Sequence, residues 1–239
     1  MLDVRSVKHF YYSQASLNTF LRCPLKFKIK YIERIHWQDD IRSEEISRRM
    51  QIGRDFHLYC ERYFSSIPIG TQSNTTLNDW INNLTQLLPI DSKNIYLPEY
   101  EIRINEDKIR LLAKYDLIII KEDGKIEIYD WKTEEKKLDK FKLENSFQTI
   151  LYMYLLKRMS KKIFGRDISA SDISMIYWQP QYKDSLVKIE YSQEKYKSHE
   201  NYIVNVIDTI NGYDFDNDFV KDEYMNECKN CEFRHLCSS

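Results

Sequence analysis

Glycine and proline are scarce in this sequence, with five of each among 239 residues. A chain so poor in both is not a linker-rich protein, and its 42% hydrophobic content is enough for a buried core. Long apolar runs are lacking too, because no stretch approaches the roughly 18 apolar residues that a membrane-spanning helix needs. We therefore expect a globular chain with no membrane partner.

Targeting and motor signals are also missing. The opening stretch MLDVRSVKHFYYSQAS has neither the apolar region nor the small-residue cleavage site of a signal peptide. This predicts a cytoplasmic protein, in which clustered cysteines more often bind metal than form disulfides. No Gly-rich loop ends in Gly-Lys-Ser/Thr, so this chain carries no helicase motor. A formal net charge of −1 does not by itself indicate nucleic-acid binding, although a local basic groove can exist in a chain whose total charge is near zero.

The order of the elements indicates a mixed α/β fold. Apolar spacing predicts two short helices over 14–32, with Pro24 in the first turn of the second, then helices over 44–64 and after an N-cap at Thr76. Alternating patterns predict the remaining elements: strands 99–104, 108–120 and 125–131, a helix 146–160, strands 172–179 and 185–191, and a helix 193–210. The turn between the second and third strands is Asp123-Gly124.

We expect one integrated unit with three parts. Residues 1–92 form a helical N-terminal part, residues 93–210 form the α/β core, and residues 211–239 form a cysteine-rich tail.

Three candidate catalytic residues lie close together in the stretch YDLIIIKEDGKIEIYDWKT. Asp116 and Asp130 fall on neighbouring predicted strands, and Lys132 shares a strand face with Asp130 because it follows by two residues. Two carboxylates at one point repel each other unless a cation lies between them, and hard oxygen ligands suit Mg²⁺ or Mn²⁺. A lysine beside such an ion can stabilise negative charge or help to deprotonate water, as phosphodiester hydrolysis requires. Asp-x-Lys is a common sequence, and an exposed hairpin with scattered charges is the alternative interpretation.

Two helices add weaker candidates. Gln148 and Tyr152 are four residues apart and so share one helix face, although packing alone would explain them. His57 shares a face with Cys60 and Phe64 and is expected to point inward, but a single helix histidine is more often a surface or core residue.

Three of the five cysteines lie in CKNCEFRHLC at residues 228–237. Three thiolates are one short of a four-coordinate centre. Thiolate ligands suit both zinc and iron–sulfur clusters, so the spacing alone leaves both open.

Taken in chain order, several stretches resemble the motifs of the PD-(D/E)XK nuclease superfamily, in its RecB-like exonuclease branch. The size and cysteine layout are similar to the stand-alone CRISPR-associated exonucleases and to small RecB-like nucleases. The stretches are SQASLNTFLRCPLKFKIKYI (13–32), GRDFH (53–57), AKYD (113–116), DWK (130–132), QTILY (148–152) and the terminal C-x2-C-x5-C.

The resemblance implies a restriction-endonuclease-like mixed sheet core flanked by helices, with a helical N-terminal part and a C-terminal cluster-binding tail. It implies that His57, Asp116 and Asp130 bind Mg²⁺ or Mn²⁺ and that Lys132 acts in catalysis. Gln148 and Tyr152 would shape the catalytic site and contact DNA. Ala113 replaces the glycine usual in the family, and a further acidic ligand could be either Glu99 or Glu101.

The same resemblance implies a [4Fe–4S] cluster held by Cys23 together with Cys228, Cys231 and Cys237, with zinc as the alternative. Such a cluster would join the two ends of the chain. Cys60 would be a buried structural thiol, and His235 would not be a ligand.

The implied function is a metal-dependent deoxyribonuclease, an exonuclease acting on single-stranded DNA or on DNA ends. A separate helicase or CRISPR adaptation proteins are the partners that the resemblance suggests. The alternatives are a catalytically silent DNA-binding or nuclease-complex subunit, and a structural zinc protein with an unrelated α/β core.

Overall fold

The structure is a computed structural model that describes residues 10–36, 44–70, 72–106, 109–229 and 231–237. The chain divides into two compact units, each built from stretches that are distant in sequence. Unit 1 comprises residues 1–42, 103–112 and 200–239, and unit 2 comprises residues 43–102 and 113–199.

The strands form a six-stranded mixed sheet with the order β1-β3-β4-β5-β6, and β2 also pairs with β3. Strands β3 and β4 are antiparallel, β4 and β5 are parallel, and β5 and β6 are antiparallel. The strands are β1 Tyr12–Ser13, β2 Ile95–Glu106, β3 Ile109–Ile120, β4 Ile126–Trp131, β5 Ile173–Trp178 and β6 Leu186–Glu190. This sheet, flanked by helices, confirms the expected mixed α/β class.

The hairpin between β3 and β4 sets the register of the site. Its turn is the predicted Asp123-Gly124, where Gly124 adopts a positive φ of 86° and Lys121 N donates to Lys125 O at 2.9 Å. A positive φ carries no steric penalty for glycine. The resulting register pairs Leu117 with Tyr129, so that Asp116 and Asp130 come next to each other on neighbouring strands.

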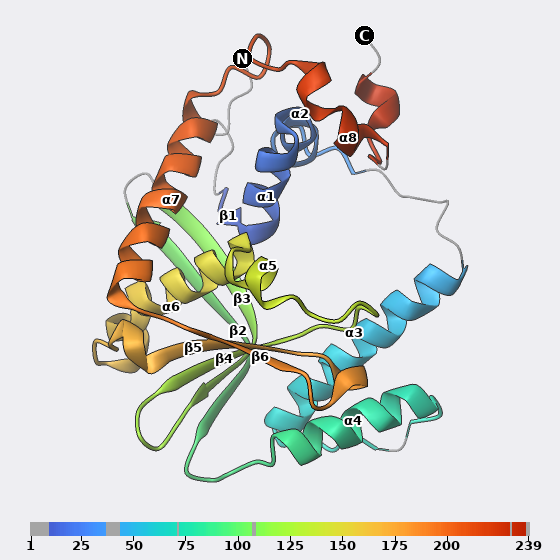
Figure 1. Cartoon of the computed structure of the whole chain (residues 1–239), viewed down its shortest axis with the longest axis vertical. Coiled ribbons are helices and arrows are strands. Elements are labelled where there is room, and N and C mark those ends of the chain that lie inside the picture. The colour runs from blue at the N-terminus through green and yellow to red at the C-terminus, as the bar shows by residue number, and fades with distance from the viewer. Residues whose placement is uncertain (1–9, 37–43, 71, 107–108, 230, 238–239) are drawn as a thin grey trace. The chain divides into compact units, whose positions relative to one another are not determined.

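Helices cover both faces of the sheet in unit 2 (Figure 1). On one face, α3 Glu44–Phe64 and α4 Thr75–Leu87 bury Phe56 and Leu84 in a cluster with Trp178 and other alternate residues of β3, β4 and β5. On the other face, α6 Phe147–Phe164 reaches Tyr177, the neighbour of Trp178, whose hydroxyl lies 2.8 Å from Thr149 Oγ1. Adjacent residues of a strand point to opposite faces, which explains this division.

Two details of unit 2 differ from the sequence prediction. The N-cap of α4 is Asn74, whose Oδ1 accepts from Leu77 N at 3.1 Å, and Thr76 lies within the helix. A short helix that the sequence did not predict, α5 Lys140–Glu144, precedes α6.

Unit 1 contains α1 Gln14–Arg22, α2 Pro24–Phe27 and the short α8 Met225–Cys228, while α7 Gln193–Gly212 continues from unit 2 into unit 1. Pro24 occupies the first turn of α2, as predicted. Phe20 packs edge-on against Tyr213, with ring centroids 5.3 Å apart, and so joins the N-terminal helices to the tail within this unit. None of the helices in the described ranges is both long enough and apolar enough to cross a membrane.

Candidate metal and active site

Three side chains from three elements of unit 2 converge to form a candidate metal site. His57 of α3, Glu99 of β2 and Asp116 of β3 each offer one ligand atom, and these atoms lie within 4.8 Å of one another. His57 Nδ1 is 3.5 Å from Asp116 Oδ1. One nitrogen and two carboxylate oxygens form a donor set that suits Mg²⁺ or Mn²⁺.

Glu99 resolves the choice that the sequence left open between two glutamates. It has a positive φ of 50°, which is uncommon for a residue other than glycine and re-aims its side chain relative to the regular alternation of β2. Its carboxylate also pairs with Lys114 Nζ at 2.6 Å. Glu101, two residues later, is exposed and is outside the three-residue group.

Asp130 occupies the adjoining position but has different partners. It is 4% exposed, accepts a hydrogen bond from Gln148 Nε2 at Oδ1, and forms an ion pair through Oδ2 with Lys132. Lys132 Nζ also donates to Gln148 Oε1 at 3.0 Å. Asp116 is fixed separately, because its Oδ2 accepts from Trp131 N at 2.8 Å. The structure therefore brings Asp130, Lys132 and Gln148 together, as the sequence motifs predicted. Asp130, however, is not part of the three-residue group of His57, Glu99 and Asp116.

The electrostatics of the site reflect carboxylates that are crowded and buried. The pKa of Asp130 is raised to about 6, chiefly by burial and also by the charge of Asp116, while Lys132 and His57 oppose the shift. Burial alone would lower the pKa of His57, but its hydrogen bond to Asp116 and the charges of Asp116, Asp130 and Glu99 make the net shift upward. The upward shift of His57 against its own burial indicates that carboxylate charge dominates around the imidazole.

Tyr152 borders this group from α6. Its ring centroid is 4.8 Å from that of Tyr115, whose hydroxyl donates to Tyr152 O at 2.9 Å. Burial raises the pKa of Tyr152, the charges of Asp130 and Asp116 raise it as well, and a hydrogen bond with Gln148 opposes them. Tyr152 is therefore a neutral hydroxyl beside the carboxylates.

Two small residues in the motifs have different structural demands. Gly53 of GRDFH lies where α3 approaches the segment after β4, and a Cβ there would meet Thr133 Oγ1 at 2.7 Å. Ala113, in contrast, lies buried within β3 and is not among the described residues with positive φ. Alanine at position 113 is thus compatible with the local backbone.

The four cysteines named by the resemblance all belong to unit 1, and there they line one small cavity: Cys23, Cys228, Cys231 and Cys237. Burial raises the pKa of Cys23, and the neighbouring Cys231 and Cys228 raise it further. Within the described residues, these sulfurs do not form a group as close as that of His57, Glu99 and Asp116. Cys60 is separate, buried at 1% exposure in the core of unit 2.

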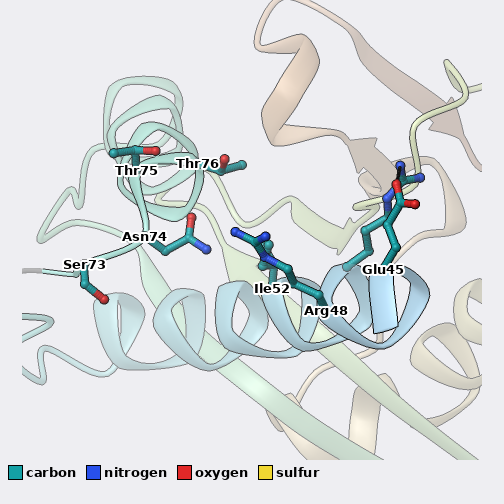
Figure 2. A pocket seen from close by; sticks show the side chains of 8 residues that line it. Glu45, Arg48, Ile52, Ser73, Asn74, Thr75 and Thr76 are labelled. Atoms are coloured by element: carbon teal, nitrogen blue, oxygen red, sulfur yellow. Dashed lines mark hydrogen bonds and ion pairs between the residues drawn. The ribbon is translucent and has the colours of Figure 1, made fainter. Parts of the chain in front are cut away.

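A different cavity of unit 2, with a volume of about 410 Å³, lies between the first turns of α3 and the start of α4 (Figure 2). Arg48 of α3 extends toward Asn74 there, and Thr75 and Thr76 add hydroxyl groups. None of the candidate catalytic side chains lines this cavity.

Comparison with known proteins agrees with the fold and the motifs. The family model described as the PD-(D/E)XK nuclease superfamily matches residues 11–96 and 91–238. Among solved structures, one similar chain is a "Putative exonuclease" from Eubacterium rectale, with a TM-score of 0.52 and 12% identity, over 88% of this chain and 86% of that one. Another, SSO0001, has a TM-score of 0.42 and 15% identity, over 98% and 88% of the respective chains.

No curated protein shows a significant sequence match to this chain. The family model alone spans almost the whole sequence, and its two segments contain every motif residue described above. The chain belongs to the PD-(D/E)XK nuclease superfamily.

Proposed function

We propose that this protein is a metal-dependent deoxyribonuclease whose divalent ion is bound by His57, Glu99 and Asp116, with Asp130 as a further ligand. The observation that carries the proposal is the convergence of three ligand atoms within 4.8 Å, next to Asp130, Lys132 and Gln148. Nucleases of this superfamily generally use Mg²⁺ or Mn²⁺, and DNA is the substrate that the family implies.

The three ligand atoms fit such an ion. Mg²⁺ binds oxygen at about 2.0–2.1 Å, which places adjacent ligands about 3 Å apart and opposite ligands roughly 4.2 Å apart, so the three ligand atoms would move closer together when the ion binds. Lys114 is largely exposed and can share Glu99 with an ion. When bound, the ion supplies Lewis-acid assistance to attack on the phosphorus.

The side chains of the protein have separate tasks in this proposal. Asp130 and Gln148 fix the Lys132 ammonium, which stabilises the charge that develops on the phosphate. The same ammonium helps to orient the attacking water by donating a hydrogen bond to its oxygen. Tyr152 remains protonated because its pKa is raised, so its hydroxyl can donate to a phosphate oxygen.

Cleavage of end-labelled single-stranded and double-stranded DNA, with and without Mn²⁺ or Mg²⁺, tests this function. We expect Asp116→Ala and Lys132→Ala to lower the rate by on the order of 10²–10³-fold or more. Glu99→Ala should weaken the apparent Mn²⁺ affinity at least about tenfold, whereas the matched variant Glu101→Ala should not. Wild-type rates in the Lys132 and Asp116 variants would refute the assignment.

We also propose that Cys23, Cys228, Cys231 and Cys237 bind an iron–sulfur cluster. Four thiol side chains around one cavity support a metal centre. A single tetrahedral zinc with bonds of about 2.3 Å would hold its sulfurs roughly 3.8 Å apart. The choice of iron–sulfur over zinc rests on the resemblance of the C-x2-C-x5-C motif, and metal analysis distinguishes the two centres.

The type of nuclease, its preferred DNA and its partners are proposed from the sequence motifs. We propose an exonuclease that acts on single-stranded DNA or DNA ends, in the RecB-like branch, and that works beside a helicase or CRISPR adaptation proteins. The similar protein from Eubacterium rectale is itself described as a "Putative exonuclease", which is consistent with this proposal. The end-labelled substrates above measure this directly, because an exonuclease releases short products from one labelled end.

A further inference from the structure

The segment between β4 and α6 is a loop whose two ends meet at the candidate active site. It leaves the site at Lys132 and returns to it at Gln148, and these two side chains are joined by a 3.0 Å hydrogen bond. Along the way it contacts α3, where Arg49 pairs with Glu135 at 2.7 Å, before it forms α5. Any ligand bound on this segment therefore lies close to the proposed site of cleavage.

The backbone of this loop is held by a side chain in the protein interior. Gln179 is 0% exposed, its Oε1 accepts from Leu138 N at 3.1 Å, and its Nε2 donates to Glu134 O and Lys136 O at 2.7 and 2.9 Å. A buried amide is costly unless its hydrogen bonds are satisfied. Here every one of these bonds goes to an exposed loop, so the loop is ordered before any ligand arrives.

This ordered loop displays an uncovered aromatic ring among lysines, one of which, Lys137, lies over the Tyr182 ring at 5.3 Å from its centroid. Phe141 of α5 is 76% exposed, the highest value among the large hydrophobic side chains described. Four exposed lysines accompany it, and within the described part of the chain none of them forms an ion pair: Lys136, Lys137, Lys140 and Lys142. Phe141 adds little to the core, so packing does not explain it.

We propose that α5 and the loop before it form a single-strand binding platform, in which Phe141 stacks on an unpaired base and the lysines contact the flanking phosphates. This inference rests on the proposed nuclease function. Aromatic rings beside a basic track are how proteins bind single strands without regard to sequence. Bases in a duplex are already stacked, so the ring selects single-stranded DNA next to the cleavage site.

A single exposed apolar side chain is ordinary on a protein surface. Three features distinguish Phe141 from that case. Its loop is fixed by Gln179, the lysines on both sides of the ring form no ion pair within the described residues, and both ends of the loop belong to the candidate active site. The segment also carries four acidic residues, but Glu135 pairs with Arg49 and Glu144 with Lys195, which leaves the four lysines in excess over Glu134 and Asp139. A protein partner would use the ring but would not need this excess of positive charge.

Binding is measured by fluorescence anisotropy with labelled oligothymidine and with a blunt duplex, on the full chain in EDTA so that no cleavage occurs. We expect Phe141→Ala and Phe141→Leu to weaken single-strand binding roughly 5- to 100-fold, and Phe141→Trp to retain it. Leucine keeps the apolar surface and loses the ring, so this pair separates stacking from simple hydrophobic contact. Duplex binding should be unchanged in all three variants.

The charge contribution is measured from the salt dependence of the same binding. Lys140→Gln/Lys142→Gln should reduce the slope of log affinity against log salt by about 1–2, at roughly 0.7 for each single-strand phosphate contact. The matched control is Lys161→Gln/Lys162→Gln. These two exposed lysines are near the other end of α6, about 20 Å along the helix from Gln148.

The outcomes separate the two proposals. If the wild type cleaves DNA but Phe141→Leu binds oligothymidine as tightly as the wild type, the platform is wrong and the nuclease stands. If Phe141→Ala leaves binding unchanged and instead alters self-association in size-exclusion chromatography, the ring covers a protein contact and the platform is again overturned. If the wild type neither binds nor cleaves DNA, the proposed function itself fails.

Discussion

Asp130 is the residue in which stability and the proposed function oppose each other most directly. Its carboxylate is buried at the end of β4 next to Asp116, and burial is the main reason that its pKa rises from 3.8 to about 6. In the folded protein it therefore binds a proton more tightly than in the unfolded chain. Stability linked to this group is present at low pH and is lost as the pH rises from 3.8 through about 6.

Asp130→Asn should consequently stabilise the metal-free protein at pH 8 while it abolishes cleavage. Asparagine keeps the shape and removes the buried charge, so the melting temperature in EDTA should rise by several degrees, at about 2–4 °C per kcal/mol for a chain of this size. At pH 4 to 5 the difference should shrink, because Asp130 is then neutral too. Differential scanning fluorimetry against pH checks this, and a variant less stable than the wild type at pH 8 would contradict it.

At the scale of the element, the approach of α3 to the segment after β4 positions the site. Gly53 allows this contact, since a Cβ there would lie 2.7 Å from Thr133 Oγ1, and Thr133 follows Lys132 directly. Alanine is the better helix former by about 1 kcal/mol. Glycine at position 53 therefore lowers helix stability but allows a close contact beside Lys132, the proposed catalytic lysine.

Gly53→Ala should lower kcat about 10- to 100-fold with little change in melting temperature, because a displacement near 1 Å costs a rate factor of that order. The double variant Gly53→Ala/Thr133→Ala should recover most of the activity. It removes the Oγ1 atom and leaves Thr133 Cβ at 3.6 Å, an ordinary contact distance. Steady-state kinetics with Thr133→Ala as control decide the matter, and full activity in Gly53→Ala would show that the contact has no positioning role.

The elements that were predicted are those with strong periodic patterns, such as α3, α6 and the β3–β4 hairpin. The short α5 was missed because its five residues are too few to show an apolar period, and none of them is buried. Asn74, two residues before the expected cap, was missed because either residue type can cap a helix.

The candidate site was predicted only in part, for a similar reason. Asp116, Asp130, Lys132 and Gln148 follow from strand pairing and from motifs. Glu99 could not be distinguished from Glu101, because two residues of a regular strand share a face. The positive φ at Glu99 breaks that alternation, and no sequence pattern marks it. Gln179 was missed because its role depends on backbone groups that are more than 40 residues away in the chain.

At the scale of the whole molecule, unit 1 brings together the two ends of the described chain with residues 103–112. Lys26 pairs with Glu232 at 2.6 Å, and Lys28 pairs with Asp216 at 2.7 Å. Such exposed or half-exposed polar contacts contribute little, typically 0–1 kcal/mol each. A metal centre held by Cys23 and the three C-terminal cysteines would contribute far more, because its binding free energy becomes folding free energy.

Cys231→Ala should therefore remove the bound iron and lower the melting temperature by several degrees or more when the protein is purified without oxygen. Cys60→Ala is the matched control, since Cys60 is in the core of unit 2 and outside the cysteine cavity. Its loss leaves a small void that lowers stability, but the iron content should stay at the wild-type level. Metal analysis and thermal melting of the same samples separate the two effects. Stoichiometric zinc in place of iron would correct the identity of the centre, whereas unchanged metal and melting temperature in Cys231→Ala would show that the cysteines do not join the two ends of the chain.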